Sequence, residues 1–600
     1  MDTIMKKILS IIALGAAFAF TVSCDLSEYN PNAFGPAIAF ATEENCQLGI
    51  NAFYNAFPSV TGAYSQEQGG VDYMTAKQMN NRFQVGYGPA SEGDWSDWDD
   101  IRRINYYLTM MNSEACGVTG EVKENFVGQA RFFRAYKYFG MLRSYGDVPW
   151  YDHVIGPSNK ADEYKDRDSR DEIVFHIIED LDYAIDHITA TSKDATTITK
   201  EVAQFVKMRV CLYEASFRKY NNITASVKGV AFNRYGVNDL YRLAADAAKA
   251  IMDSGQYKLV ADYRSLFTSG SLQKDEVLLG AATSPTIKGS QNNYFNYRAE
   301  SPRSLTRAFI NTFLMKDGTV YTAKSGYETE SFAQEFVNRD PRLAKIVRTP
   351  GYHFADAVVT PRFDIAPTGY QIIKFCLDDY QYLNTDEKGE ANGNATPIFR
   401  YAEVLLDYAE AKAELGEMDA NIWASTIGAI RQRAGITGGN NLPTVVDPYL
   451  KANFYKNVDD PVIMEIRRER ACELCLEGQR NSDLLRWGCG EILASLPWTG
   501  LNVAGINTPI DLDGDGNYDV YFNEAGKTVP DEYKSIKIDV NDQTGLEVVK
   551  NGTAYQLQYN IASTLRNWDA DGHLRLAALA KTMIEEYEKN GYTLTQNPGY

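Results

Sequence analysis

The sequence predicts a mainly α-helical fold made of degenerate tetratricopeptide-like helical repeats, with long loop-rich and short-strand insertions. Apolar side chains recur at helical spacing, as where Val174, Ile177 and Leu181 form one stripe opposite acidic residues. An alanine-rich row over 244–248 would let two helices approach closely. Two long stretches rich in Gly, Asn, Thr, Asp and Tyr interrupt this pattern, which indicates loops, hairpins and brief strands between the helices.

The helices are expected in pairs, as in repeats with a period of about 34 residues. The predicted pairs are 121–145 with 171–188, 200–220 with 239–254, and 400–416 with 421–434, and a last helix is predicted near 461–487. We expect the repeats mainly in 40–270 and 398–490, and the loop-rich insertions in 276–397 and 490–572. No low-complexity linker divides the chain, so a single domain over 24–600 is predicted.

Residues 1–23 have the layout of a cleaved secretory signal. Lys6 and Lys7 precede an apolar run over 8–20 that is too short to span a bilayer comfortably. Cys24 follows Thr-Val-Ser, which resembles the pattern in which bacterial lipoprotein processing acylates the thiol and makes the cysteine the first mature residue. We therefore expect a lipoprotein signal peptide over 1–23 and a lipid (palmitate) anchor on Cys24. The alternative is an ordinary signal peptide followed by a chance cysteine.

Charge and composition narrow the classes of partner. The formal net charge is −19, with no dense stripe of Lys and Arg, so the surface repels phosphate backbones and nucleic acid is not expected as a partner. Aromatic residues make up 12% of the chain, and its 39 Tyr combine an apolar ring face with a hydroxyl, which suits polar, ring-shaped ligands. Eight Cys are present, and the odd, scattered set that remains once Cys24 is acylated argues against a disulfide framework.

Catalytic motifs are weak in this sequence. The five His are isolated, with no H-E-x-x-H motif, and there is neither a G-x-S-x-G nucleophile elbow nor a glycine-rich phosphate loop. Cys472 and Cys475 form a C-x-x-C in a helical pattern without a second pair, so they are expected to be buried apolar side chains. No catalytic residue and no required cofactor are predicted. Carboxylates are abundant, and a paired-carboxylate glycoside hydrolase stays open as an alternative.

One segment has the spacing of a calcium loop. Oxygen-bearing residues fill positions one, three, five, seven and nine of an EF-hand-like loop: Asp511, Asp513, Asp515, Asn517 and Asp519. Carboxylates that converge on one turn repel each other unless a cation neutralises them. Position twelve is Phe522, where a Glu is usual. We expect either a structural calcium ion or a solvated acidic turn between strands.

Motifs dispersed over most of the chain give it a family resemblance. They are QARFFRAYKYFG at 129–140, YGDVP at 145–149, MKDG at 315–318, NRDPRL at 338–343, FRYAEVLLDYAEA at 399–411, AIRQRAG at 429–435, the arginine-rich 466–488 and LTQNPGY at 594–600. The chain resembles the SusD/RagB family of Bacteroidetes surface lipoproteins, which bind nutrients, mainly glycans, beside a TonB-dependent outer-membrane transporter. The arginines and carboxylates of these motifs predict ion pairs that fix helix packing rather than catalysis.

The resemblance implies a fold and a function. It implies a SusD-like fold and a non-enzymatic protein that captures an oligosaccharide at the outer face of the outer membrane and delivers it to a SusC-like TonB-dependent transporter. Delivery by a hinged lid would require different affinities in the open and closed states. Besides the glycoside hydrolase, the alternatives are a peptide-binding protein and an adaptor of helical repeats with no small ligand.

Loop aromatics are the expected ligand contacts, because a sugar ring stacks its C–H face on an aromatic ring while amides and hydroxyls bind its hydroxyls. The first predicted cluster lies in the irregular segment 58–98 and consists of Tyr73, Arg82, Phe83, Tyr87 and Trp95. The second, between a strand expected at 276–280 and a helix expected from Ser304, consists of Asn292, Asn293, Tyr294, Phe295 and Tyr297. Trp498 is a third candidate, whereas Trp98 is expected in the core.

Overall fold

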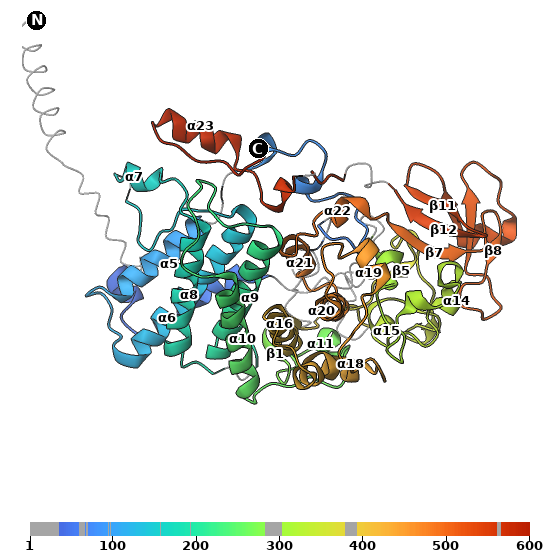
Figure 1. Cartoon of the computed structure of the whole chain (residues 1–600), viewed down its shortest axis with the longest axis horizontal. Coiled ribbons are helices and arrows are strands. Elements are labelled where there is room, and N and C mark those ends of the chain that lie inside the picture. Colours follow the sequence, from blue (N-terminus) through green and yellow to red (C-terminus); the bar gives the residue numbers. More distant parts are fainter. Residues whose placement is uncertain are drawn as a thin grey trace, which may run out of the picture.

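The computed structural model describes residues 35–58, 67, 70–93, 95, 98–156, 158–191, 194–282, 303–378, 393–560, 566–569 and 571–600. The helices of the first half of the chain lie side by side at one end of the molecule, and the strands of its last quarter lie at the other end (Figure 1). None of the helices within these residues combines the length and the apolar character that crossing a membrane requires.

The first half of the chain is a row of helices in which α5 packs on α6, α6 on α8, α8 on α9 and α9 on α10. These helices and the one before them are α3 (Glu43–Phe53), α5 (Trp98–Met111), α6 (Gly120–Tyr145), α8 (Arg170–His187), α9 (Lys200–Tyr220) and α10 (Val237–Asp253). The alanines of α10 are buried, and α10 contacts both α9 and α16 (Tyr401–Glu414), so the predicted close approach of helices is confirmed.

Local signals explain where these helices begin and end. The Ser169 hydroxyl accepts the backbone N–H of Glu172 at the start of α8, and the Thr199 hydroxyl accepts that of Val202 at the start of α9. Helix α6 stops at Gly146, whose φ of 79° lies in the left-handed region that glycine adopts without strain. The four helices predicted in this half are confirmed to within two residues at each end.

The later helices pack against this row, since α16 contacts both α10 and α20. They are α17 (Ala420–Trp423), α18 (Ala429–Ala434), α19 (Pro448–Asn453), α20 (Pro461–Glu473), α21 (Arg480–Arg486) and α22 (Ile492–Ser495). A π-helical turn, Ala424–Gly428, joins α17 to α18, so the segment predicted at 421–434 is helical throughout. The shorter helices are α2 (Pro36–Ala39), α7 (Lys160–Glu163), α11 (Ser265–Thr268), α13 (Arg307–Ile310), α14 (Phe332–Glu335), α15 (Leu343–Ile346) and α23 (Lys581–Lys589).

The single helix predicted over 461–487 is wrong, because the chain leaves the helix between α20 and α21. Leu476, with φ 66°, and Gly478, with φ 80°, adopt left-handed backbone conformations that no helix contains. The turn lets the Glu477 carboxylate reach cations on other elements. Cys472 and Cys475 beside it are buried, as predicted.

Short strands occupy both loop-rich insertions. The strand predicted at 276–280 is confirmed as β1 (Val277–Ala281), which pairs antiparallel with β6 (Thr396–Arg400). The helix predicted from Ser304 is wrong, since Ser304 begins β2 (Ser304–Leu305) and only the short α13 follows. The remaining strands are β3 (His353–Phe354), β4 (Ala357–Val358), β5 (Tyr370–Gln371), β7 (Thr499–Val503), β8 (Pro509–Ile510), β9 (Val520–Glu524), β10 (Lys537–Val540), β11 (Leu546–Asn551) and β12 (Ala554–Tyr559). The last six form two three-stranded sheets, β11-β12-β7 and β10-β9-β8.

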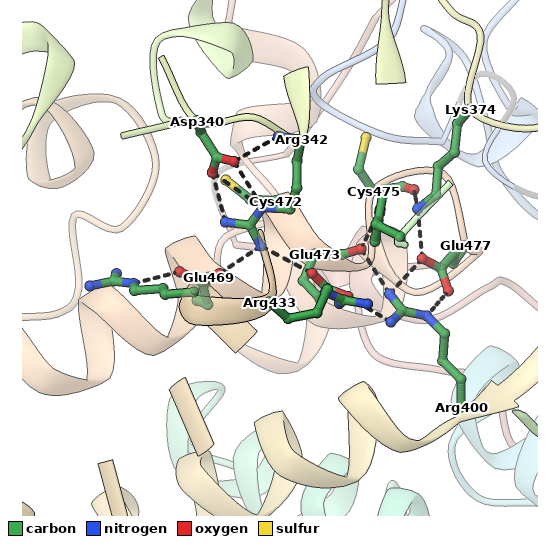
Figure 2. A network of polar contacts seen from close by, with 12 residues as sticks. Asp340, Arg342, Lys374, Arg400, Arg433, Glu469, Cys472, Glu473, Cys475 and Glu477 are labelled. Atoms are coloured by element: carbon green, nitrogen blue, oxygen red, sulfur yellow. Dashed lines mark hydrogen bonds and ion pairs between the residues drawn. The ribbon is translucent and has the colours of Figure 1, made fainter. Parts of the chain in front are cut away.

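A buried network of arginines and carboxylates ties β6, α18 and α20 together (Figure 2). Glu473 of α20 is paired with Arg400 of β6 at 2.6 Å, with Arg342 at 3.1 Å and with Arg433 of α18. Burial alone would raise the pKa of Glu473, but Arg433, Arg400 and Arg342 outweigh it and hold this pKa well below its ordinary value. The ion pairs predicted for these motifs are therefore present, and they lie in the core.

The C-terminal segment 577–600 runs back across the first half of the chain (Figure 1). The amide of Asn597 donates to the Tyr145 carbonyl at 3.0 Å, and its oxygen accepts from Arg167 at 2.9 Å. In α23 the Tyr587 hydroxyl donates to the Lys165 carbonyl at 3.3 Å. These contacts place the segment beside the end of α6 and the loop between α7 and α8.

Candidate functional site

A row of aromatic rings connects two hollows near the end of α6 and the start of α5. The ring centroid of Trp95 lies 5.4 Å from that of Tyr145 and 5.4 Å from that of Trp98, and Trp98 lies 5.4 Å from Tyr151. Tyr145 lines one hollow, whereas Trp98 and Tyr151 line the other. The row thus places a polar and an aromatic cavity next to one another.

The first hollow, which we call the amide groove, has a volume of about 640 Å³. It is lined by Gln78, Met79, Asn80, Asn81, Arg82, Glu92, Ser144, Tyr145 and Ala577. The segment that carries most of these residues is fixed locally, because the Asn80 side chain accepts the backbone N–H of Arg82 at 3.1 Å and Phe83 is buried. The amide side chains of Asn80 and Asn81 remain exposed. Amides that donate and accept side by side suit a ligand rich in hydroxyls.

The charged groups of the amide groove are few. Arg82 forms no ion pair with any described residue, and its guanidinium lies 5.1 Å from the centroid of the Phe83 ring. Burial, followed by a hydrogen bond to Glu92, raises the pKa of Tyr87. Glu92 is the one carboxylate among the described residues that line the groove, whereas glycoside hydrolysis ordinarily uses two. The groove is therefore equipped to bind polar groups, with Arg82 as a free donor.

Three of the predicted aromatic contacts are core residues. Tyr73, Phe83 and Trp498 are each 1% exposed. The Tyr73 ring stacks on Phe309 at 4.5 Å, and Trp498 lies nearly parallel to Tyr559 at 6.1 Å. The prediction that these rings offer an open face to a ligand is wrong, because the loops that carry them fold into the core.

The other described members of the first cluster lie near the groove without lining it, apart from Arg82. Trp95 is 7% exposed and is packed between Trp98 and Tyr145. Tyr87 is half-buried, and its hydroxyl accepts the backbone N–H of Ala578 at 2.9 Å. Both residues hold the walls in place rather than facing the cavity.

Two further predictions lie outside the described residues. These are the second cluster, Asn292, Asn293, Tyr294, Phe295 and Tyr297, and the lipidation site Cys24. They stay predictions.

The second hollow, which we call the aromatic pocket, was not predicted. It has a volume of about 520 Å³, and Trp98, Tyr151, His153 and Tyr587 are among its lining residues. Trp98, expected in the core, is half-buried and forms part of the wall. The run Trp-Tyr-Asp-His directly after YGDVP was the available signal in the sequence. Nothing in the sequence places Tyr587 of α23 against α5.

His153 bridges two segments at the rim of the aromatic pocket. Its Nδ1 lies 2.9 Å from Asp152 and its Nε2 lies 3.0 Å from Asp162 of α7. The hydrogen bonds to Asp152 and then to Asp162 raise the pKa of His153. The protonated ring therefore ties the pocket loop to α7 more strongly than the neutral ring does.

The predicted calcium loop joins β8 to β9, in the manner of an acidic turn between strands. Carboxylate oxygens of Asp511, Asp513 and Asp519 lie within 4.8 Å of one another. Burial, and then the charges of Asp513 and Asp511, raise the pKa of Asp519. Asp515 instead accepts the backbone N–H of Asn517 at 2.7 Å, and its carboxylate does not join the cluster. Phe522 at position twelve is fully buried in β9.

Comparisons with known proteins agree with the predicted family. A family model described as SusD family matches residues 280–600, and one described as starch-binding associating with outer membrane matches residues 65–212. The SusD-like protein P2 of Formosa agariphila is 26% identical over 379 residues, which is 60% of this chain; the match spans 65% of that relative's length.

Solved structures show the same fold. A SusD-like protein of Bacteroides fragilis has a TM-score of 0.64 at 20% identity, and the match covers 94% of this chain and 98% of that one. A SusD-like carbohydrate-binding protein of the same organism has a TM-score of 0.61 at 19% identity, with 80% and 93% covered. The predicted SusD-like, mainly helical fold is confirmed.

Proposed function

Because this chain belongs to the SusD family, we propose that it is a non-enzymatic protein that binds an oligosaccharide in the amide groove. The observation that carries the proposal is the groove itself, whose described lining offers three amide side chains, an unpaired guanidinium and a carboxylate beside a row of aromatic rings. Sugar hydroxyls both donate and accept, and such planar polar groups match them. The descriptions of the matched starch-binding model and of the carbohydrate-binding relative support this ligand class.

The same proposal includes a place in the cell. Cys24 carries a lipid, the folded chain faces the exterior on the outer membrane, and the ligand passes to a SusC-like TonB-dependent transporter. The export signal and the description of the matched model as associating with the outer membrane support this placement. A tethered binding protein stays at high effective concentration beside its transporter. Loss of palmitate labelling and release from the membrane fraction in Cys24→Ala are the expected results, and an unchanged membrane fraction would contradict the anchor.

Binding to the amide groove is tested with purified protein and a panel of malto-, laminari-, xylo- and manno-oligosaccharides in isothermal titration calorimetry. Replacing Arg82 by Ala removes a charged donor, so the Kd of the best ligand is expected to rise about tenfold to a hundredfold, since hydrogen bonds to charged groups contribute about 1.5–3 kcal/mol. The matched control is Arg242→Ala, an exposed arginine of α10 that pairs with Glu417 and lies outside the groove. It is expected to bind as the native chain does.

The outcomes separate the parts of the proposal. An unchanged Kd for Arg82→Ala would show that the oligosaccharide binds elsewhere. No binding to any member of the panel would contradict the ligand class. Chromatography of the same mixtures detects hydrolysis, and product formation that requires the protein would favour the hydrolase alternative.

A further inference from the structure

A small basic cleft follows one face of α6, separate from the amide groove and the aromatic pocket. Its volume is about 190 Å³, and its walls come from α6, α9, β6, the loop between α20 and α21, and Ala56 and Pro58. The residues of α6 that line it share one half-buried helix face and are Tyr136, Lys137, Gly140 and Arg143. Arg209 of α9 lines it as well, so three cations surround a cavity in a chain whose net charge is −19.

Two of these three cations have carboxylate partners. Lys137 lies 2.9 Å from Asp100, and Arg209 donates two hydrogen bonds to Glu403, at 2.8 Å and 2.7 Å. Such pairing neutralises them within the fold.

The acidic side chain in the wall is also satisfied. Glu477 lies 2.6 Å from Arg400 and 2.6 Å from Lys374 (Figure 2). Because those two cations hold its carboxylate, Glu477 is not the partner of Arg143.

Arg143 is the one cation of these three that pairs with no carboxylate of the described residues. Its Nη1 donates to the Ser482 hydroxyl at 3.0 Å, and its guanidinium carbon lies 4.8 Å from the centroid of the Phe139 ring. Its Nε is buried and has no hydrogen-bond partner among the described residues. No carboxylate of a described residue forms an ion pair with Arg143. Burial, and then the charge of Arg209, lower the pKa of Arg143. A half-buried cation whose Nε is left in this state is costly to the fold, unless an anion from outside completes it.

Gly140 keeps the cleft open. It lies inside the 26-residue helix α6, where glycine is less favourable than alanine. No described atom lies within 4 Å of the position that a Cβ on Gly140 would take, so packing against described residues does not require the glycine. A ligand that approaches the helix backbone does require it.

We propose that this cleft binds a small oxyanion, a carboxylate or sulfate group, with Arg143 as its ion-pair partner and Lys137 and Arg209 beside it. A guanidinium binds either group through two parallel hydrogen bonds. The volume admits one small acidic group. The group is carried by an acidic sugar ring or is a free inorganic anion. This site is distinct from the amide groove and does not depend on the function proposed for it.

The experiment titrates the whole protein with sodium sulfate, sodium glucuronate and glucose at constant ionic strength, in calorimetry and in thermal unfolding. Saturable heat and a rise in Tm are expected with sulfate, glucuronate or both, and not with glucose. Sulfate alone indicates an inorganic or sulfate-ester group, and glucuronate alone indicates a sugar carboxylate. Sulfate also stabilises proteins generally by exclusion from their surface, so the difference between variants is the measurement.

Two variants decide the proposal. Gly140→Leu fills the cleft without changing a charge, and Arg143→Gln removes the unpaired cation. Both are expected to abolish the saturable heat, whereas Arg242→Gln, an exposed arginine of α10 that does not line the cleft, is expected to retain it. Heat of the same size in Gly140→Leu would overturn the site, and so would the absence of saturable heat in the native chain. If Arg143→Gln does not fold, the leucine variant alone decides between these outcomes.

Discussion

Arg400 and Arg143 lie beside the same loop between α20 and α21, but their surroundings differ. Arg400 is 1% exposed and pairs with the carboxylates of Glu473 and Glu477. Arg143 has a hydroxyl and a ring for neighbours, and Arg82 of the amide groove has a ring. An arginine by itself therefore indicates little about function in this fold. What separates Arg143 and Arg82 from Arg400 is that each lines a cavity and has no carboxylate partner among the described residues.

The largest effect on stability is expected from removing a carboxylate of the buried ion-pair network that contains Arg400. Glu473→Gln leaves three buried guanidinium groups without their shared carboxylate, so the free energy of unfolding is expected to fall by about 3–5 kcal/mol in denaturant titrations. Glu163→Gln, an exposed carboxylate paired with Lys160, is the control and should change little. Equal losses in both variants would mean that the network does not stabilise the core.

The network also predicts a response to acid. The folded pKa of Glu473 is lowered, so its contribution is present above the unfolded value of about 4.3 and is lost as pH falls towards the folded value. The gap in unfolding free energy between the native chain and Glu473→Gln should therefore narrow in acid.

The acidic loop over 511–519 is the opposite case, because there carboxylates, rather than an arginine, lack a partner of opposite charge among the described residues. We propose that Asp511, Asp513 and Asp519, which have no cation among the described residues, bind a structural calcium ion. Calcium at a hundred times its Kd would then stabilise the chain by about 2.7 kcal/mol, and Asp513→Ala would lose this gain. Asp531→Ala, an exposed residue near the same sheet, is the control. Equal stabilisation of the native chain and Asp513→Ala would identify a solvated acidic turn.

Two glycines of α6 can be compared by substitution: Gly140, which lines the basic cleft, and Gly128, which does not. Gly140→Ala is expected to stabilise the protein by about 1 kcal/mol without ligand, because alanine favours the helix and no described atom obstructs its Cβ. Gly128→Ala in the same helix should gain less or lose stability, since its Cβ would lie 3.3 Å from Ile188. Thermal unfolding of both variants measures the difference. A loss in Gly140→Ala would show that other atoms fill the cleft.

The smallest effect on stability is expected from replacing His153, whose side chain is 52% exposed. Its pKa is raised in the fold, so its bridge contributes fully below the unfolded value of about 6.5 and is lost as pH rises through the folded value. The stability difference between the native chain and His153→Gln should therefore shrink as pH rises. A difference that is constant with pH would show that the bridge does not depend on the proton.

The sequence predicts those parts of the fold that depend on neighbouring residues. Helix α9 matches its predicted range because its apolar stripe and its Thr199 cap are both local signals. The break after α20 was missed because Glu477 turns towards Arg400 and Lys374, which lie far away in the sequence.

The same reason limits what could be predicted of the candidate site. Arg82, one of the predicted ligand contacts, lines the amide groove, but Tyr73 and Trp498 are covered by residues distant in the chain. An aromatic residue in a loop has the same local pattern whether it faces a ligand or the core. Tyr587 could not be linked to Trp98 because their contact depends on how the C-terminal segment docks.

The docking of the C-terminal segment determines when the two hollows are completed during synthesis of the chain. Ala577 lines the amide groove and Tyr587 lines the aromatic pocket, while Asn597 fastens the same segment to the end of α6. A ribosome makes the helices that these residues cover long before it makes the residues themselves. Contacts between distant parts of a chain are generally slow to form. Both hollows therefore acquire their final walls late, and a nascent chain that has completed α6 and α9 does not yet have either of them in full.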